Sequence, residues 1–69
     1  MADLTSPLNG KILEINASVG DAITEDDELF IIEAMKMENP INGIDGTVKE
    51  IKVNVGDSVQ KGDVLAVIE

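Results

Sequence analysis

The sequence predicts an all-β fold, a flattened antiparallel barrel or sandwich of two four-stranded halves related by a pseudo-twofold axis. Two observations support this prediction. An internal repeat covers most of the chain, and the hydrophobic residues, 43% of the total, are almost all Ile, Val, Leu and Ala, which favours strands over helices. Because 69 residues can form only one small core, we expect a single domain over residues 1–69.

The internal repeat pairs Leu8–Glu33 with Ile44–Glu69 at a constant offset (44 − 8 = 36) and without a gap. The tripeptide Val-Gly-Asp occurs at residues 19–21 and again at 55–57. Other glycines and acidic residues also coincide between the two copies. A unit of this size cannot bury its apolar face alone, so we expect the two copies to pack face to face.

Each copy is predicted to contain a strand, a turn, a short strand, a second turn and a final strand. The first strands, Gly10–Ile15 and Gly46–Ile51, are rich in apolar residues and open with glycine. Val-Gly-Asp is typical of a turn, because glycine takes positive φ and aspartate bonds to the nearby backbone. The final strands are expected at residues 28–33 and 64–69.

The segments outside the two copies complete the predicted fold. Ala2–Thr5 adds a strand before the first copy, and Asn42–Asp45 crosses over into the second. Pro7 fits a turn before the first copy. Pro40 fits an edge strand or a strand end, because proline has no N–H to donate to a neighbouring strand.

The composition argues against several kinds of function. Without cysteine the chain has no disulfides and no zinc site built on thiolates. The absence of cysteine also mildly favours a cytoplasmic location. No apolar run is long enough for a membrane span, and the N-terminus lacks the pattern of a signal peptide, so we expect no direct membrane insertion. The formal net charge of −9 repels nucleic acid. This charge fits either a soluble surface or the attraction of partners with basic surfaces.

No conventional enzyme active site can be assembled from these residue types. The chain has no His, Cys, Tyr or Arg, and its three serines have no basic partner nearby in the sequence. The acidic residues fall at turns and strand ends, where we expect structural roles and no metal site. The glycines are interpreted as turn residues, because no helix follows them to form a phosphate loop. These serines and glycines are Ser6, Ser18 and Ser58, and Gly10, Gly20, Gly46 and Gly56.

The segment Ala34–Gly43 joins the two copies and is not repeated. With strands on either side, Met35, Lys36 and Met37 are predicted to form a hairpin tip that directs Lys36 into solvent. A lysine presented in this way suits covalent modification by another enzyme, and exposed methionines suit contacts with protein partners. The alternative is that both methionines pack into the core and Lys36 is an ordinary surface residue.

The segment Glu33–Asn39 (EAMKMEN) resembles the biotinylation motif of biotin carboxyl carrier domains. It stands at the junction of the internal repeat, where that family places it. The resemblance implies that biotin is attached to Lys36 and that Ala34, Met35 and Met37 flank the site. It also implies that a biotin protein ligase and the carboxylase partners contact the two methionines, while Glu33 and Glu38 match the wider motif.

The resemblance further implies a carrier domain that is not itself an enzyme. Biotin on Lys36 would carry CO2 between a biotin carboxylase and a carboxyltransferase, within a carboxylase, transcarboxylase or decarboxylase. Two features depart from the family pattern. Pro7–Gly10 replaces a Pro-Met-Pro-Gly signal, and the first copy lacks the insertion that forms a thumb, so the chain resembles the thumbless carriers.

Two further questions stay open at this point. The Ala- and Pro-rich linker that often precedes such domains is not present, which fits either a free-standing carrier or a piece of a longer subunit. The lipoyl domain of 2-oxo acid dehydrogenase complexes is similar in fold and in its hairpin lysine. Its lysine is usually flanked as Asp-Lys-Ala, so Met35 and Met37 favour biotin over lipoate.

Overall fold

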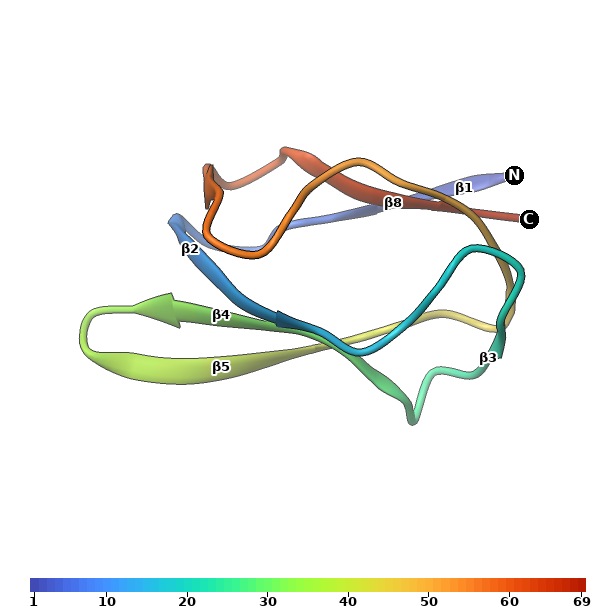
Figure 1. The fold of residues 1–69 in the computed structure, drawn as a ribbon, viewed down its shortest axis with the longest axis horizontal. Helices are drawn as coiled ribbons and strands as arrows, with labels where there is room; N and C mark the ends of the chain where they lie inside the picture. Colours follow the sequence, from blue (N-terminus) through green and yellow to red (C-terminus); the bar gives the residue numbers. More distant parts are fainter.

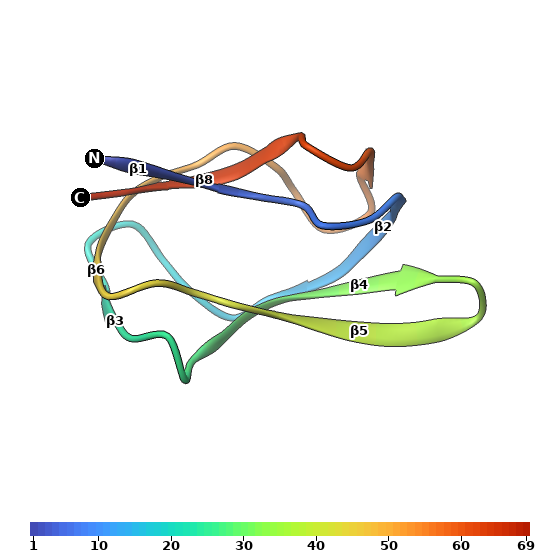
Figure 2. The ribbon, with the colours of Figure 1, turned by 180° about the vertical axis from the view of Figure 1, so that it is seen from behind.

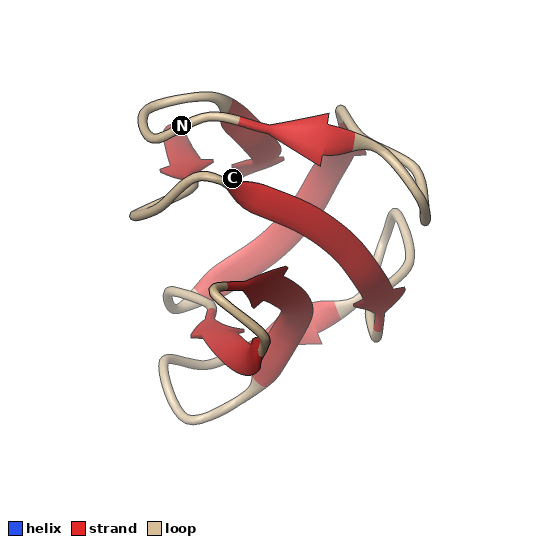
Figure 3. Ribbon diagram, turned by 90° about the vertical axis from the view of Figure 1, so that its left-hand side faces the viewer, coloured by secondary structure: helices blue, strands red, loops and turns tan.

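The computed structural model describes residues 1–69 and consists of eight strands joined by turns, without helices (Figures 1 and 3). None of its segments is a helix of the length and hydrophobicity needed to cross a membrane. The strands are β1 (Ala2–Thr5), β2 (Gly10–Ile15), β3 (Ala22–Ile23), β4 (Glu28–Ala34), β5 (Met37–Asn42), β6 (Gly46–Ile51), β7 (Ser58–Val59) and β8 (Val64–Ile68).

The strands form two four-stranded antiparallel sheets, in the orders β1-β8-β6-β3 and β5-β4-β2-β7. The two orders are equivalent. Replacing each strand of the first sheet by its counterpart in the other half of the chain, β1 by β5, β8 by β4, β6 by β2 and β3 by β7, gives the second sheet. The all-β, pseudo-twofold architecture predicted from the repeat is therefore confirmed. Each sheet nevertheless takes strands from both halves of the sequence, so the two halves interlock and cannot separate as two stacked units.

The symmetry extends to β1 and β5, which the sequence comparison did not include. Leu4 and Ile41 occupy equivalent buried positions, at an offset of 37 (41 − 4) in place of 36. The backbone confirms this offset. Ser6 N–H donates to the carbonyl of Asp63 at 2.9 Å, and Gly43 N–H donates to the carbonyl of Asp27 at 2.9 Å. The connection between β5 and β6 is one residue shorter than the connection between β1 and β2, and this hides the relationship from a gapless comparison.

Each Val-Gly-Asp turn binds the first strand of the other half. Gly20 N–H donates to the carbonyl of Val48 at 2.8 Å, and Val48 N–H donates to the carbonyl of Asp21 at 2.9 Å. Gly56, Ile12 and Asp57 repeat the same exchange, with both distances at 2.8 Å. These reciprocal bonds tie the two halves together through the most strongly repeated part of the sequence.

The core lies between the two sheets and is aliphatic, as the composition predicts. Most buried positions hold residues of similar size in the two halves. The pairs are Ile12 and Val48, Ile23 and Val59, Leu29 and Leu65, and Ile32 and Ile68. Phe30 is the largest exception, because Ala66 stands at the equivalent position. One large and one small side chain at equivalent places fill a shared interior more evenly than two phenylalanines would.

Gly10 and Gly46 open β2 and β6, so their interpretation as turn residues is wrong. A Cβ built on Gly10 would lie 2.4 Å from the carbonyl oxygen of Glu33, and one on Gly46 would lie 2.6 Å from that of Glu69. Each glycine therefore permits the close approach of a neighbouring strand. Gly20 and Gly56 do lie in turns, with φ of +96° and +95°.

The molecule is elongated, with extents of 31 × 19 × 17 Å. The hairpin of β4 and β5 forms one end of the long axis, and the N- and C-termini lie together at the opposite end (Figures 1 and 2). Ala2 pairs with Ile68 at that end. The scaffold therefore presents the unrepeated residues as far from the chain ends as its size allows.

Candidate functional site

The hairpin tip consists of two residues, Met35 and Lys36, between β4 and β5. Ala34 and Met37 are paired across the two strands, so Met37 begins β5. The prediction of a three-residue tip that includes Met37 is wrong by one residue. Met35 and Lys36 have φ of 54° and 63°, as a type I′ turn requires. This turn type matches the right-handed twist of the two strands and projects the lysine away from them.

The side chains of the tip are exposed to solvent. Met35 is 93% exposed, Met37 is 65% exposed, and Lys36 is exposed as well. The alternative in which both methionines pack into the core is therefore wrong. Lys36 makes no side-chain hydrogen bond or salt bridge, since the one ion pair in the structure joins Lys52 and Glu50 at 3.0 Å. The amine is free to meet an incoming reagent.

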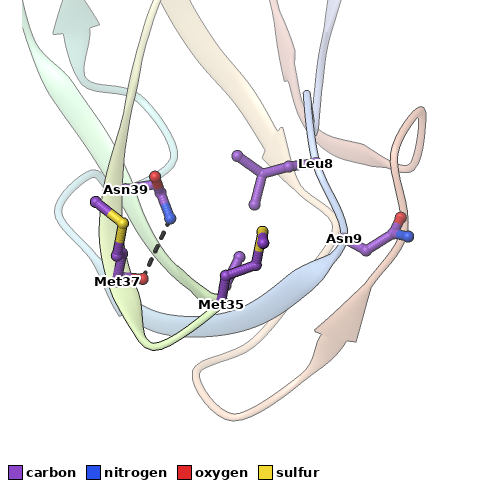
Figure 4. Close-up of a pocket in the computed structure, with 6 residues that line it drawn as sticks. Leu8, Asn9, Met35, Met37 and Asn39 are labelled. Atoms are coloured by element: carbon purple, nitrogen blue, oxygen red, sulfur yellow. Dashed lines mark hydrogen bonds between the residues drawn. The ribbon is translucent and has the colours of Figure 1, made fainter.

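Asn39 holds the two strands together just behind the tip. Its side-chain amide donates to the carbonyl oxygen of Ile32 at 3.3 Å. It also donates to the carbonyl oxygen of Met37 at 3.2 Å, the bond drawn in Figure 4. Ile32 lies opposite Asn39 on β4, so one side chain ties both strands. Pro40 follows on β5, an edge strand, as predicted from its missing N–H. These features fix the tip on a rigid support.

An open pocket of about 370 Å³ lies beside the tip and brings together residues from two distant parts of the sequence. The lining residues are Leu8, Asn9, Ala34, Met35, Met37 and Asn39. The side chains of Leu8 and Met35 point into the same space from opposite sides, and Asn9 is directed toward the turn before β8 (Figure 4). Lys61 N–H holds Asn9 in this orientation by donating to its Oδ1 at 2.7 Å.

All four residues predicted for the site, Ala34, Met35, Lys36 and Met37, lie together at the end of the hairpin. Sequence reasoning did not identify Leu8 and Asn9, which come from the connection between β1 and β2. Nothing in the local sequence of that connection marks it, because its proximity to Met35 results from the pairing of β2 with β4.

Four aspartates have the kind of structural role expected of the acidic residues. Asp21 accepts from Ser18 N–H and Asp57 from Asn54 N–H, each at 2.8 Å. Asp27 and Asp63 close the second turn of each copy in the same way, at 2.9 and 2.8 Å. No three acidic side chains come close enough to hold a metal ion together.

Residues 2–68 match the protein family described as "Biotin-requiring enzyme". The chain belongs to this family. The match includes the whole hairpin and both copies of the repeat, so family membership rests on the entire fold as well as on the tip.

One relative is the biotin carboxyl carrier protein of Streptococcus mutans, which is 47% identical over 38 residues. This match covers 55% of the chain and 29% of the relative. The matched segment thus covers less than a third of that protein's length.

Two solved structures share this fold. A domain of the urea carboxylase from Kluyveromyces lactis superimposes with a TM-score of 0.89 at 38% identity, covering 99% of this chain and 6% of that one. The lipoyl domain of the 2-oxoglutarate dehydrogenase complex from Azotobacter vinelandii superimposes with a TM-score of 0.82 at 25% identity, covering 100% and 96%. A member of the biotin-requiring family and a lipoyl domain thus share this backbone, so the residues at the tip must distinguish biotin from lipoate carriers.

Proposed function

We propose that this domain is a biotin carboxyl carrier in which biotin is joined to Lys36 through an amide. A biotin protein ligase would transfer the biotinyl group from an activated adenylate to the Nζ of Lys36, with release of AMP and a proton. When bound, biotin supplies a ureido nitrogen that accepts and gives up a carboxyl group. The chain's own residues present, orient and support the attachment point.

A single observation carries this proposal: a free lysine lies between two exposed methionines on a two-residue turn at the outer end of a rigid hairpin. Backbone pairing up to Ala34 and Met37 keeps the lysine at a fixed place. A ligase must bring one amine to its activated acyl group, and a fixed turn lowers the entropy cost of that alignment. The two methionines supply adaptable apolar contacts.

The proposed partners are a biotin carboxylase and a carboxyltransferase, which would visit the same tip in turn. The domain supplies no catalytic group of its own in this scheme; it keeps the reactive group at high local concentration near both active sites. The surrounding enzyme would be a carboxylase, a transcarboxylase or a decarboxylase. Exposed Met35 and Met37 are the contact points expected to be shared by the ligase and both enzymes.

Ligase labelling followed by intact mass measurement tests the proposal. The full chain is incubated with a biotin protein ligase, ATP and biotin, and we expect one biotinyl group per chain. Lys36→Arg should remove labelling completely while leaving thermal unfolding unchanged, because the exposed side chain makes no hydrogen bond or salt bridge in the structure. Lys61→Arg is the matched control and should be labelled like the wild type.

Two results would contradict the proposal. Labelling of Lys36→Arg at the wild-type level would place the modification elsewhere. Attachment of lipoate by a lipoyl ligase, with no reaction of the folded chain with the biotin ligase, would make this a lipoyl carrier, the alternative that the shared backbone leaves room for.

A further inference from the structure

The pocket beside the tip is the one pocket of the structure, and it adjoins the residue proposed to carry biotin. Ala34, Met35 and Met37 line it, and they flank Lys36 directly in the sequence. We infer that this pocket binds the ring system of the biotinyl group attached to Lys36, so that the arm has a docked state on its own domain. This inference rests on the proposed function and adds an intramolecular binding site to it.

The size and lining of the pocket suit a small sulfur-containing ring system. Its volume of about 370 Å³ falls at the lower end of the range of small-molecule sites, about 300–1,000 Å³. Four of the six lining residues are hydrophobic. Leu8 and Met35 face each other across the space (Figure 4), and methionine adapts its shape to an irregular apolar partner.

Asn39 supplies a polar contact of the right kind. Its amide nitrogen is occupied, because it donates to the carbonyls of both Ile32 and Met37. Its Oδ1 accepts no hydrogen bond within the protein and is left for a donor from a ligand. The ureido ring of biotin carries two N–H groups and can therefore donate to Asn39 while its apolar neighbour ring packs against Leu8.

The covalent tether makes even weak binding sufficient. A group held by a short flexible linker has an effective concentration in the millimolar range at a nearby site. An intrinsic dissociation constant of about 1 mM would therefore leave the arm docked for about half of the time. Docking would cover Met35, which is otherwise 93% exposed. Partner enzymes would then take up the undocked fraction of the arm.

The pseudo-symmetry of the fold provides a matched pair of variants for the test. Leu8 and Ile44 are equivalent at the repeat offset (44 − 8 = 36), and both are partly buried against the core. Only Leu8 lines the pocket. Leu8→Ala and Ile44→Ala should therefore lose similar core packing, but only Leu8→Ala should disturb docking.

The experiment uses the full chain, isotopically labelled, biotinylated by ligase and verified by intact mass. We expect nuclear Overhauser contacts between the biotin ring protons and the Leu8 methyl groups. Capture of the arm by streptavidin, measured by stopped flow at limiting concentration, should be about twofold faster for Leu8→Ala than for the wild type. Ile44→Ala should match the wild type.

The outcomes separate the two proposals. Full biotinylation with no ring-to-Leu8 contact and equal capture rates would overturn the docking site and leave the carrier function standing. Acceleration of Ile44→Ala to the level of Leu8→Ala would also overturn it, by attributing the effect to general loosening of the core. If Lys36 takes no biotin at all, the proposed function fails, and the docking site fails with it.

Discussion

The Val-Gly-Asp turns and the hairpin tip reach the same region of backbone conformation with different residues. In the turns, Gly20 and Gly56 take φ of +96° and +95°, at no steric cost. At the tip, Met35 and Lys36 take φ of 54° and 63°. Such a conformation costs about 1–2 kcal/mol for an ordinary residue. The residues of the repeated turns therefore suit their backbone conformation, whereas the residues of the tip lower the stability of the fold.

The difference shows where each kind of constraint acts. The tip is held in its strained conformation by the pairing of Ala34 with Met37 and by the two bonds of Asn39. The strain is local, because neither side chain of the turn contributes to the core. Backbone strain of this kind supports the hypothesis that the side chains of Met35 and Lys36 have a functional role.

The largest effect is expected where glycine permits two strands to approach. In Gly10→Ala, the new Cβ would overlap the backbone carbonyl of Glu33 on the central strand β4. We expect the free energy of unfolding to fall by about 3 kcal/mol, the upper range for overpacking. Urea unfolding followed by circular dichroism measures this. A loss below that of a turn-glycine variant would show that β2 and β4 can separate at little cost.

A smaller effect is expected in the turns that use positive φ. Gly20→Val and Gly56→Val place a β-branched residue in this conformation, with no atom within 4 Å of the new Cβ. Each should lower the free energy of unfolding by about 2 kcal/mol from backbone strain alone. Neither residue lines the pocket. Ligase labelling of the folded fraction should stay at the wild-type rate; a lower rate per folded molecule would link the turns to the tip.

The aspartates of the same turns should contribute less to the free energy of unfolding than the glycines do, and the two aspartates should contribute equally. Asp21 and Asp57 each accept one backbone N–H bond at 2.8 Å in an exposed position. Asp21→Ala and Asp57→Ala should each cost about 1 kcal/mol, the typical net value of one hydrogen bond. Unequal losses in parallel urea titrations would show that the two halves are less equivalent in energy than in backbone geometry.

Much of this architecture could be predicted from the sequence because each strand and turn of the repeat is indicated in both copies. The predicted first strands, Gly10–Ile15 and Gly46–Ile51, are confirmed at both ends. The exchange of strands between the sheets was not predictable, since a repeat identifies equivalent strands and not their partners. The pocket forms because the pairing of β2 with β4 brings Leu8 close to Met35, so it could not be predicted from the sequence either. Modification of Lys36 itself stays a prediction.

The smallest change in stability should come from relieving the strained turn. This change should be an increase, whereas the other variants lower the free energy of unfolding. Asparagine tolerates positive φ and is favoured in type I′ turns, whereas methionine is not. Met35→Asn should therefore raise the free energy of unfolding by about 0.5 kcal/mol, seen as a higher urea midpoint at unchanged slope. The same variant should be biotinylated more slowly, because it loses an apolar side chain that is 93% exposed. Met35→Leu is the control, which keeps the hydrophobic contact and the strain and should resemble the wild type in both measurements. A lower midpoint for Met35→Asn would mean that packing of Met35 near Leu8 outweighs the backbone strain, and the tip would then belong with the stabilising turns of the fold.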